Sequence, residues 1–546
     1  MAEWSRIHGD SLTAPRMNRD SVTSLGSGRA NYNGVVPLIE RIERAHAAIV
    51  YGLLAVLLAA VFVPMSLLRL VDGDEGTYLL VSRLVVEGQV PYHDFFYPQM
   101  FLLPYVYGAW MKLVSYSWYG ARVLSAVFSI ALGVLVCRQA ARLAGARRWG
   151  VLAVVLFTFS SLAFGWYPLV KTFVLPTLFL FAAYAVLSSA SRWRWVASGV
   201  LIGLATDCRV YLIAVVPAFV LELYLTEADT RRRLMHFARF AIGLALALLP
   251  NELFFLIEPR TFLFNIVGNQ VIRSDFGLLG WVEQRVGVVE QLLAINRADG
   301  VTSFQFLLLF LLNLTSWVSS ALLRERPSLV STIVLSLLLI SLAPTPVYTQ
   351  YFCIPIPFLV VNAVVFLARL DRDALGPRLR HLFASIAAVY VLVSPFDLYR
   401  YSYGGALVPG ITGAANVVDW RIPTIRAVAR AIDHNLRRDR QLAISFWPGY
   451  FVETRASLLP GLENHFALIF SRKVSPHEVT QFKLMSYPEL ARHLRQRTVD
   501  VIVLGNWTDW AHNRESIRSQ IVQNGYVMKE RIANTEIYAP ALDGHQ

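Results

Sequence analysis

The stretch AHAAIVYGLLAVLLAAVFVPMSLLRL, residues 45–70, is the first long apolar run of the chain, and Val-Asp72-Gly-Asp74-Glu75-Gly-Thr-Tyr78 follows it at once. At about 1.5 Å per residue, a helix of about 20 apolar residues crosses the hydrocarbon core of a bilayer. The run is therefore long enough to remain as an uncleaved membrane anchor. It places two adjacent carboxylates, Asp74 and Glu75, just beyond the lipid, where ionisable side chains tend to mark a functional site.

The composition of the whole chain is that of a membrane protein. Of its 546 residues, 55% are hydrophobic and 16% are charged, whereas soluble domains average about 45–50% apolar and about 25% charged residues. A soluble enzyme is thereby excluded. The net charge of +13 comes from short arginine clusters between apolar runs, where charge sets membrane orientation, so we expect no nucleic acid partner. The cysteines, Cys137, Cys208 and Cys353, are too few and too scattered for a disulfide framework or a Cys-rich zinc site.

Long apolar runs divide the chain into three parts. Residues 1–44 are expected to form a disordered cytoplasmic tail, because they hold no apolar run long enough for a signal peptide core. Residues 45–400 are expected to form a polytopic helical membrane domain of about eleven spans. The expected spans are 45–70, 122–144, 149–165, 171–190, 196–208, 210–226, 237–257, 304–323, 328–343, 351–368 and 382–395.

The stretch Met100 to Tyr119 decides the orientation of these spans. It is apolar, but it is interrupted by Pro104, Gly108 and Lys112 and is rich in aromatic residues. If it lies at the membrane surface, the arginine clusters at 138–148, 192–194, 231–233, 324–326 and 369–380 all fall on the cytoplasmic side. If it crosses, all of them fall outside. The positive-inside bias therefore favours a surface segment, and it places the loops beginning at residues 71, 165, 207, 258 and 344 on the outer face.

Residues 401–546 have the pattern of a small α/β domain, expected on the same outer face. Strands are expected at Gln441–Phe446, Val499–Leu504 and Glu536–Tyr538. Apolar residues at three- and four-residue spacing predict helices between them. These helices are expected at Thr424–Arg437, Pro488–Gln496 and Arg514–Gln523.

The acidic pair that follows the first span has two interpretations. Asp74 could be an N-cap and Glu75 a first-turn acid of a helix lying on the membrane, stabilised by unpaired amides and the helix dipole. Alternatively, a carboxylate at the mouth of a membrane cavity could accept a proton from an attacking hydroxyl, as general-base catalysis requires. The residues alone do not choose between the two.

A resemblance to a known family favours the second interpretation. The phrases that carry it are Asp74-Glu75-Gly-Thr-Tyr78, Glu87-Gly-Gln-Val-Pro91-Tyr92-His93-Asp94, Pro98, Pro104-Tyr105 and Ala121-Arg122-Val123-Leu124-Ser125-Ala126. With these phrases the chain resembles the GT-C glycosyltransferases, and more narrowly bacterial members of the superfamily that holds the protein O-mannosyltransferases and the lipid A aminoarabinose transferase. In that family an Asp-Glu pair follows the first span, and two juxtamembrane helices make up the first outer loop.

The resemblance implies transfer of a sugar from a polyprenyl-phosphate carrier to a lipid, glycan or protein acceptor, usually with inversion. It implies that Asp74 is the catalytic base and that Glu75 orients the acceptor or tunes Asp74 by like-charge repulsion. Asp94 stands where relatives often carry an acid, and it would bind acceptor or sugar hydroxyls. Many relatives have a lysine shortly after that acid, but this chain has Phe95, Phe96 and Tyr97 there. Part of the contact to the carrier phosphate must therefore come from elsewhere.

Two cations are placed to contact the departing phosphate, whose developing charge needs fixed donors. Lys171 begins a span, and Arg209 lies between two apolar segments, both on the expected outer face. Lys171 could instead extend along a helix end to reach water, and Arg209 could pair with Asp207. Arg273, in the loop after residue 258, is a further cation without a motif.

Two aromatic loops could contact the carrier or the sugar. Tyr348, Gln350 and Tyr351 resemble a late loop that closes over the carrier in relatives, although an interfacial aromatic belt explains them equally simply. The stretches 447–450 and 459–466 suit sugar stacking, but ordinary turn chemistry also accounts for them. His465 lacks metal-ligand neighbours in the sequence, and we expect no obligatory metal or other cofactor.

The function expected from these features is that of a polyprenyl-phosphate-sugar-dependent glycosyltransferase in a plasma or inner membrane. A transporter or flippase of a lipid-linked sugar is an alternative, but paired halves with broken helices are not evident. An O-antigen polymerase or ligase is another alternative, against which the Asp-Glu phrase argues.

Overall fold

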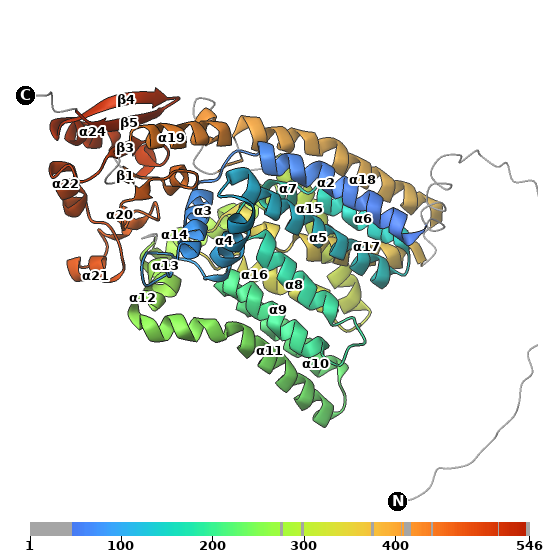
Figure 1. Cartoon of the computed structure of the whole chain (residues 1–546). Coiled ribbons are helices and arrows are strands. Elements are labelled where there is room, and N and C mark those ends of the chain that lie inside the picture. Colours follow the sequence, from blue (N-terminus) through green and yellow to red (C-terminus); the bar gives the residue numbers. More distant parts are fainter. Residues whose placement is uncertain are drawn as a thin grey trace, which may run out of the picture. The chain divides into compact units, whose positions relative to one another are not determined.

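Helices make up most of the chain before residue 405, and a small sheet lies near its C-terminal end (Figure 1). The structure is a computed structural model that describes residues 46–273, 277–295, 300–372, 376–405, 407–408, 417–437, 441–511 and 513–541. The expected cytoplasmic tail, residues 1–44, lies outside the described residues.

The helices before residue 405 follow the apolar runs of the sequence. They are α2 (Ala47–Leu68), α3 (Gly73–Val86), α4 (Leu102–Val114), α5 (Trp118–Ala144), α6 (Arg147–Thr158), α7 (Ser161–Trp166), α8 (Val174–Val186), α9 (Arg194–Cys208), η1 (Val210–Val215), α10 (Val216–Thr226), α11 (Thr230–Ile257), α12 (Pro259–Leu263), η2 (Phe264–Gly268), α13 (Asn269–Ile272), α14 (Gly277–Leu292), α15 (Val301–Leu322), α16 (Leu329–Ile340), η3 (Thr349–Cys353), α17 (Ile356–Arg372), α18 (Gly376–Tyr399) and η4 (Arg400–Gly404).

Four of these helices are both long and apolar enough to cross a membrane, among the described residues. They are α2, α5, α11 and α15, and shorter apolar helices occupy 174–186, 210–226 and 329–340. The expectation of eleven spans therefore stays a prediction. The two helices expected in the first loop are present as α3 and α4, which pack against each other.

Glycines allow close packing of α9 against α11. A Cβ atom at Gly199 would collide with the carbonyl oxygen of Phe240, and one at Gly243 would collide with that of Val196. Small residues of this kind let two helix backbones approach, as in membrane helix pairs. The packing fixes the C-terminal end of α9, where Arg209 lies.

The C-terminal part contains a five-stranded sheet of order β2-β1-β3-β5-β4. Its strands are β1 (Leu442–Ser445), β2 (Ser457–Leu458), β3 (Val501–Leu504), β4 (Tyr526–Ile532) and β5 (Thr535–Pro540). Strand β1 is parallel to β2 and β3, whereas β5 is antiparallel to β3 and β4. The helices and short turns of this part are η6 (Val418–Trp420), α19 (Ile422–His434), η7 (Pro448–Phe451), α20 (Ala467–Phe470), α21 (Pro476–Gln481), α22 (Tyr487–Arg495), α23 (Thr508–Ala511) and α24 (Arg514–Gln523).

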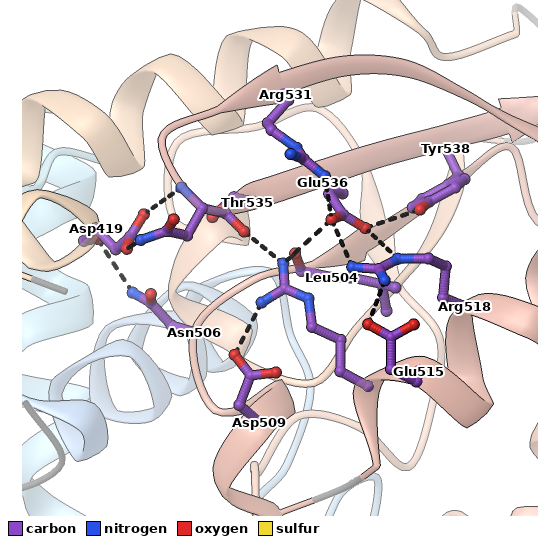
Figure 2. A network of polar contacts seen from close by, with 12 residues as sticks. Asp419, Leu504, Asn506, Asp509, Glu515, Arg518, Arg531, Thr535, Glu536 and Tyr538 are labelled. Carbon is purple, nitrogen blue, oxygen red and sulfur yellow. Dashed lines mark hydrogen bonds and ion pairs between the residues drawn. The ribbon is translucent and has the colours of Figure 1, made fainter. Parts of the chain in front are cut away.

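The sheet agrees with the sequence-based expectation at its centre. Strands β1, β3 and β5 and helices α19, α22 and α24 lie where they were expected, whereas β2 and β4 were not expected. Polar networks fix the sheet to its neighbours, and Figure 2 shows Arg518 and Arg531 converging on Glu536. The Glu536 carboxylate also accepts a bond from the Tyr538 hydroxyl at 2.8 Å. A boundary between domains 45–400 and 401–546 stays a prediction.

The C-terminal part packs directly on α3. The Trp447 indole donates a hydrogen bond to the Gly73 carbonyl at 2.8 Å, and a Cβ at Gly76 would lie 2.6 Å from the Gly449 Cα. A helix lying on the membrane was expected here. The helix is present as α3, and its position at the membrane stays a prediction. Its burial along most of its length, partly under residues that are distant in the sequence, was not expected.

Candidate active site at the N-terminus of α3

The N-terminus of α3 is capped by Asp72. Its carboxylate accepts the Asp74 backbone N–H at 3.1 Å, and the Glu75 carboxylate reaches back to the Asp72 N–H at 3.5 Å. This reciprocal pair is a capping box, with Asp at the cap and Glu three residues later. The interpretation of Asp74 as the N-cap is therefore wrong. Its side chain is not used by the cap and remains 35% exposed.

Glu75 points away from Asp74 and into the protein. Its carboxylate receives the Arg122 Nε at 2.8 Å and the Arg122 Nη2 at 2.6 Å, and both side chains are fully buried. The Val170 N–H donates to it at 3.1 Å, and Arg122 Nη1 donates to the Arg69 carbonyl at 2.6 Å. This arrangement joins α3, α5, the end of α2 and the turn before Lys171. The Glu75–Arg122 ion pair is buried away from water and acts as a structural anchor. Neither residue lines the pocket that contains Asp74.

The Asp74 side chain lines a pocket, which we call the Asp74 pocket. Six of the predicted site residues line it, namely Asp74, Lys171, Arg209, Tyr348, Gln350 and Tyr351. Tyr78 and Gln270 are among the lining residues that the sequence reasoning did not assign to the site. Asn464 and His465 also line it, and they belong to the stretch 459–466, for which sugar stacking was one of two interpretations. Arg273, which no motif marked, lines it too. Segments from seven separated regions of the chain thus meet in one pocket.

Lys171 is the cation nearest to Asp74. Its Nζ lies 2.6 Å from Asp72 Oδ1 and 3.0 Å from Asp74 Oδ2, and its side chain is 3% exposed. The alternative of a lysine extending along a helix end to water is wrong, because the ammonium group is buried between two carboxylates. Burial alone raises the pKa of Asp74, but Lys171 and His465 outweigh it and hold that pKa well below its usual range.

Arg209 lies among aromatic rings that also line the pocket. Its guanidinium carbon is 4.8 Å from the Phe173 ring centroid and 4.7 Å from the Tyr351 ring centroid, and its Nη1 donates to Thr172 Oγ1 at 2.6 Å. The alternative pairing with Asp207 is wrong, because the Asp207 carboxylate accepts a bond from Asn251 instead. The buried Nε of Arg209 has no hydrogen-bond partner within the described part of the chain. A buried donor of this kind suits an anionic ligand.

His465 is brought to Asp74 by the C-terminal part. Its Nδ1 lies 3.1 Å from Thr77 Oγ1 and its Nε2 lies 3.5 Å from Asp74 Oδ1. The imidazole stacks on the Trp507 ring with centroids 4.5 Å apart. Its Nε2 makes no hydrogen bond to any described residue. The only signal in the sequence was a single histidine in an aromatic loop punctuated by Pro and Gly.

The loop at residues 348–351, which includes the start of η3, also lines the Asp74 pocket. Tyr348 and Gln350 line the pocket, and the Gln350 Oε1 is buried without a hydrogen bond to a described residue. Tyr351 is buried between Phe173 and Arg209. Asp94, in contrast, does not line the pocket. Its carboxylate is 36% exposed and accepts the Val90 N–H at 2.6 Å, with His93 Nδ1 at 2.8 Å.

No group of three or more His, Cys, Asp and Glu side chains that could hold a metal ion occurs in the part of the chain that the structure describes. Asp74 and His465 are neighbours of two or more cations, Lys171 and Arg273 included. The charge of the pocket therefore favours an anionic ligand over a cation.

The arrangement can be compared with known proteins. Residues 98–252 match the model of the dolichyl-phosphate-mannose-protein mannosyltransferase family. A crystal structure of ArnT from Cupriavidus metallidurans, bound to undecaprenyl phosphate, is similar over 92% of this chain and 100% of its own, with a TM-score of 0.60 and 15% identity. The apo structure of that protein is similar over 90% and 98%, with a TM-score of 0.56 and 14% identity.

The chain has the GT-C fold. The resemblance inferred from the Asp74-Glu75 phrase is thereby confirmed at the level of the fold. No curated protein sequence matches the chain. In this GT-C chain, the segment matched by the family model contains Arg122, Lys171 and Arg209, whereas Asp74 precedes it and His465 follows it.

Proposed function

We propose that the protein transfers a sugar from a polyprenyl-phosphate carrier to an acceptor, with Asp74 as the general base. The observation that carries the proposal is the meeting of one partly exposed carboxylate with the cations Lys171, Arg209 and Arg273 in a single pocket. The similarity to a structure with bound undecaprenyl phosphate supports a carrier of that class. The positive-inside bias supports a reaction on the extracytoplasmic face of a plasma or inner membrane.

The proposed reaction is a single displacement with inversion. The hydroxyl oxygen of the acceptor forms a bond to the anomeric carbon of the sugar, and the bond between that carbon and the carrier phosphate oxygen breaks. Asp74 takes the hydroxyl proton, and the phosphate leaves with the electron pair. The charge that develops on the phosphate is stabilised by Lys171 and by the guanidinium group of Arg209, two residues that line the pocket.

The low pKa of Asp74 fits this role when the carrier is bound. Without an anion, Lys171 sits between Asp72 and Asp74 and keeps Asp74 ionised, which makes the carboxylate a weak base. A carrier phosphate at Lys171 competes for the same ammonium group, so the pKa of Asp74 rises when the donor binds. Asp74 therefore becomes a stronger base only in the loaded site.

Glu75 is proposed as a positioning residue. Its bidentate pair with Arg122 fixes the first turn of α3, and with it the direction of Asp74. Asp94 lies outside the pocket, so a role in binding sugar or acceptor hydroxyls requires the acceptor to extend to it. No obligatory metal is proposed, since cations of the chain itself surround Asp74.

The experiment is transfer of label from a polyprenyl-phosphate sugar in membranes that contain the protein. Asp74→Asn should lower transfer by at least about a hundredfold, the usual contribution of a general base. Glu87→Gln is the matched control, because it removes a partly exposed carboxylate at the other end of α3 that does not line the pocket. Normal transfer by Asp74→Asn would refute the assignment of the base.

The same assay separates a transferase from a transporter or flippase. A flippase moves labelled lipid between leaflets without forming a new glycosidic bond, so product analysis distinguishes the two. An O-antigen polymerase or ligase would use a pyrophosphate carrier. Transfer from a polyprenyl-monophosphate sugar but not from a polyprenyl-pyrophosphate sugar therefore excludes that alternative.

A further inference from the structure

A second cavity, of about 730 Å³, lies at the other end of the helix bundle. Helices α8 and α9 connect the two sites, because α8 begins next to Phe173 of the Asp74 pocket and carries Tyr184 of the second cavity. In the same way, α9 begins with Arg194 at the second cavity and ends next to Arg209 at the Asp74 pocket. The volume is within the range of pockets that hold small ligands, about 300–1,000 Å³.

Four arginines line this cavity, which we call the arginine cavity: Arg142, Arg194, Arg326 and Arg369. Glu222 is the only carboxylate in its lining. Arg369 pairs with Glu325 at 2.8 Å, outside the lining. Arg142 and Arg194 donate only to the backbone carbonyls of Ser188 and Ser189, and the described residues offer Arg326 no hydrogen bond or ion pair. Arg369 is thus matched by Glu325, and Arg326 acts on the Glu222 carboxylate. Arg142 and Arg194 have no acid partner among the described residues, and this excess of positive charge around a hollow favours binding of an anion.

One residue of the same lining carries a buried donor. Trp195 lines it and is 5% exposed, and its indole Nε1 has no hydrogen-bond partner among the described residues. An indole N–H can only donate, and a buried donor without an acceptor costs free energy. An oxygen of a ligand in the cavity would supply that acceptor once the ring turns towards it. This feature is independent of the arginines and indicates the same anionic chemistry.

We propose that the arginine cavity binds the phosphate headgroup of an anionic glycerophospholipid. The positive-inside bias puts this end of the bundle at the cytoplasmic headgroup level, where such lipids are abundant. Guanidinium groups recognise phosphate oxygens by charge-assisted hydrogen bonds, and Trp195 supplies one more donor. Leu143, Val330 and Phe366 give the lining an apolar portion, which suits the glycerol backbone and the first methylenes of the acyl chains.

Native mass spectrometry of the purified, delipidated full-length protein tests the proposal by counting bound lipids. The probes are phosphatidylglycerol, phosphatidylcholine, polyprenyl phosphate and inorganic phosphate. Arg326→Gln removes one cation in an exposed turn, and Trp195→Phe removes the indole donor while keeping an aromatic ring. Arg138→Gln is the matched control, because Arg138 is exposed on α5 and does not line the cavity.

The expected result is tighter binding of phosphatidylglycerol than of phosphatidylcholine by the native chain. Arg326→Gln and Trp195→Phe should each weaken phosphatidylglycerol by about tenfold, as expected for one hydrogen bond to a charged group, while Arg138→Gln leaves it unchanged. Equal binding by all four proteins overturns the proposal. The proposal is also overturned if the two variants lose binding of polyprenyl phosphate or of inorganic phosphate but keep binding of phosphatidylglycerol, because the ligand is then not a glycerophospholipid. The binding measurement does not depend on transferase activity.

Discussion

Glu75→Gln separates a structural from a chemical role for the second acid of the pair. The carboxylate accepts two bonds from Arg122, at 2.8 and 2.6 Å, and one from the Val170 N–H at 3.1 Å, and neither charged side chain is exposed. A glutamine loses the charge and turns an amide N–H₂ towards a guanidinium donor. Removal of one partner from a buried pair costs about 3–5 kcal/mol, mostly because the other charge stays buried alone.

The assay is equilibrium unfolding in mixed micelles, with transfer measured on the fraction that remains folded. Glu87→Gln is the matched control on the same helix, because its pair with Arg83 is partly exposed and such pairs contribute about 0–1 kcal/mol. The double change Glu75→Leu with Arg122→Met removes both charges and should recover a large part of the loss. It recovers less than all of it, because the carbonyl of Arg69 loses its donor.

A stability of Glu75→Gln within about 1 kcal/mol of the native chain would refute the anchor role. If its transfer per folded molecule were also abolished, Glu75 would take part in the chemistry itself. The double variant then could not recover activity.

Three further outcomes are expected. Arg209→Gln should lower kcat/KM for the polyprenyl-phosphate donor, with a loss in kcat, because Arg209 is proposed to stabilise the charge that develops on the leaving phosphate. Steady-state kinetics at varied donor concentration checks this, and an unchanged kcat/KM contradicts it. Burial raises the pKa of Glu463 to about 7, so the folded state loses stability as pH rises from about 4.5 to about 7. Glu463→Gln should therefore be more stable than the native chain at pH 8 but not at pH 4. Equilibrium unfolding at the two pH values tests this. Gly76→Ala should loosen the C-terminal part from α3, because the added Cβ meets Gly449 Cα at 2.6 Å; faster proteolysis of residues after 405 is the expected sign, and unaltered cleavage would contradict the packing argument.

Membrane topology explains why part of the pocket was predictable. Lys171, Arg209 and the 348–351 loop were assigned to one face because alternate ends of apolar runs share a side of the bilayer. The structure brings all of them to one pocket. Glu75 and Asp94 were assigned by their place in a motif, and a motif does not specify which way a side chain points. Glu75 turned to Arg122 and Asp94 turned to the Val90 N–H.

The missed features depend on contacts that have no local pattern. His465 reaches Thr77 over 388 positions of sequence, and nothing near either residue marks the pairing. Strand β2 has only two residues, too few for alternation, and β4 is mostly exposed and charged. The burial of α3 was also missed, because the residues that cover it, Trp447 and Gly449, belong to the C-terminal part.

The position of His465 has a consequence for biosynthesis. The ribosome makes Asp74 early and His465 near the end of the chain, so a nascent protein holds the acid long before it holds the imidazole. A chain interrupted before residue 465 inserts its helices but lacks one wall of the Asp74 pocket. Only a chain that is translated past residue 465 and docked on α3 can therefore complete the Asp74 pocket.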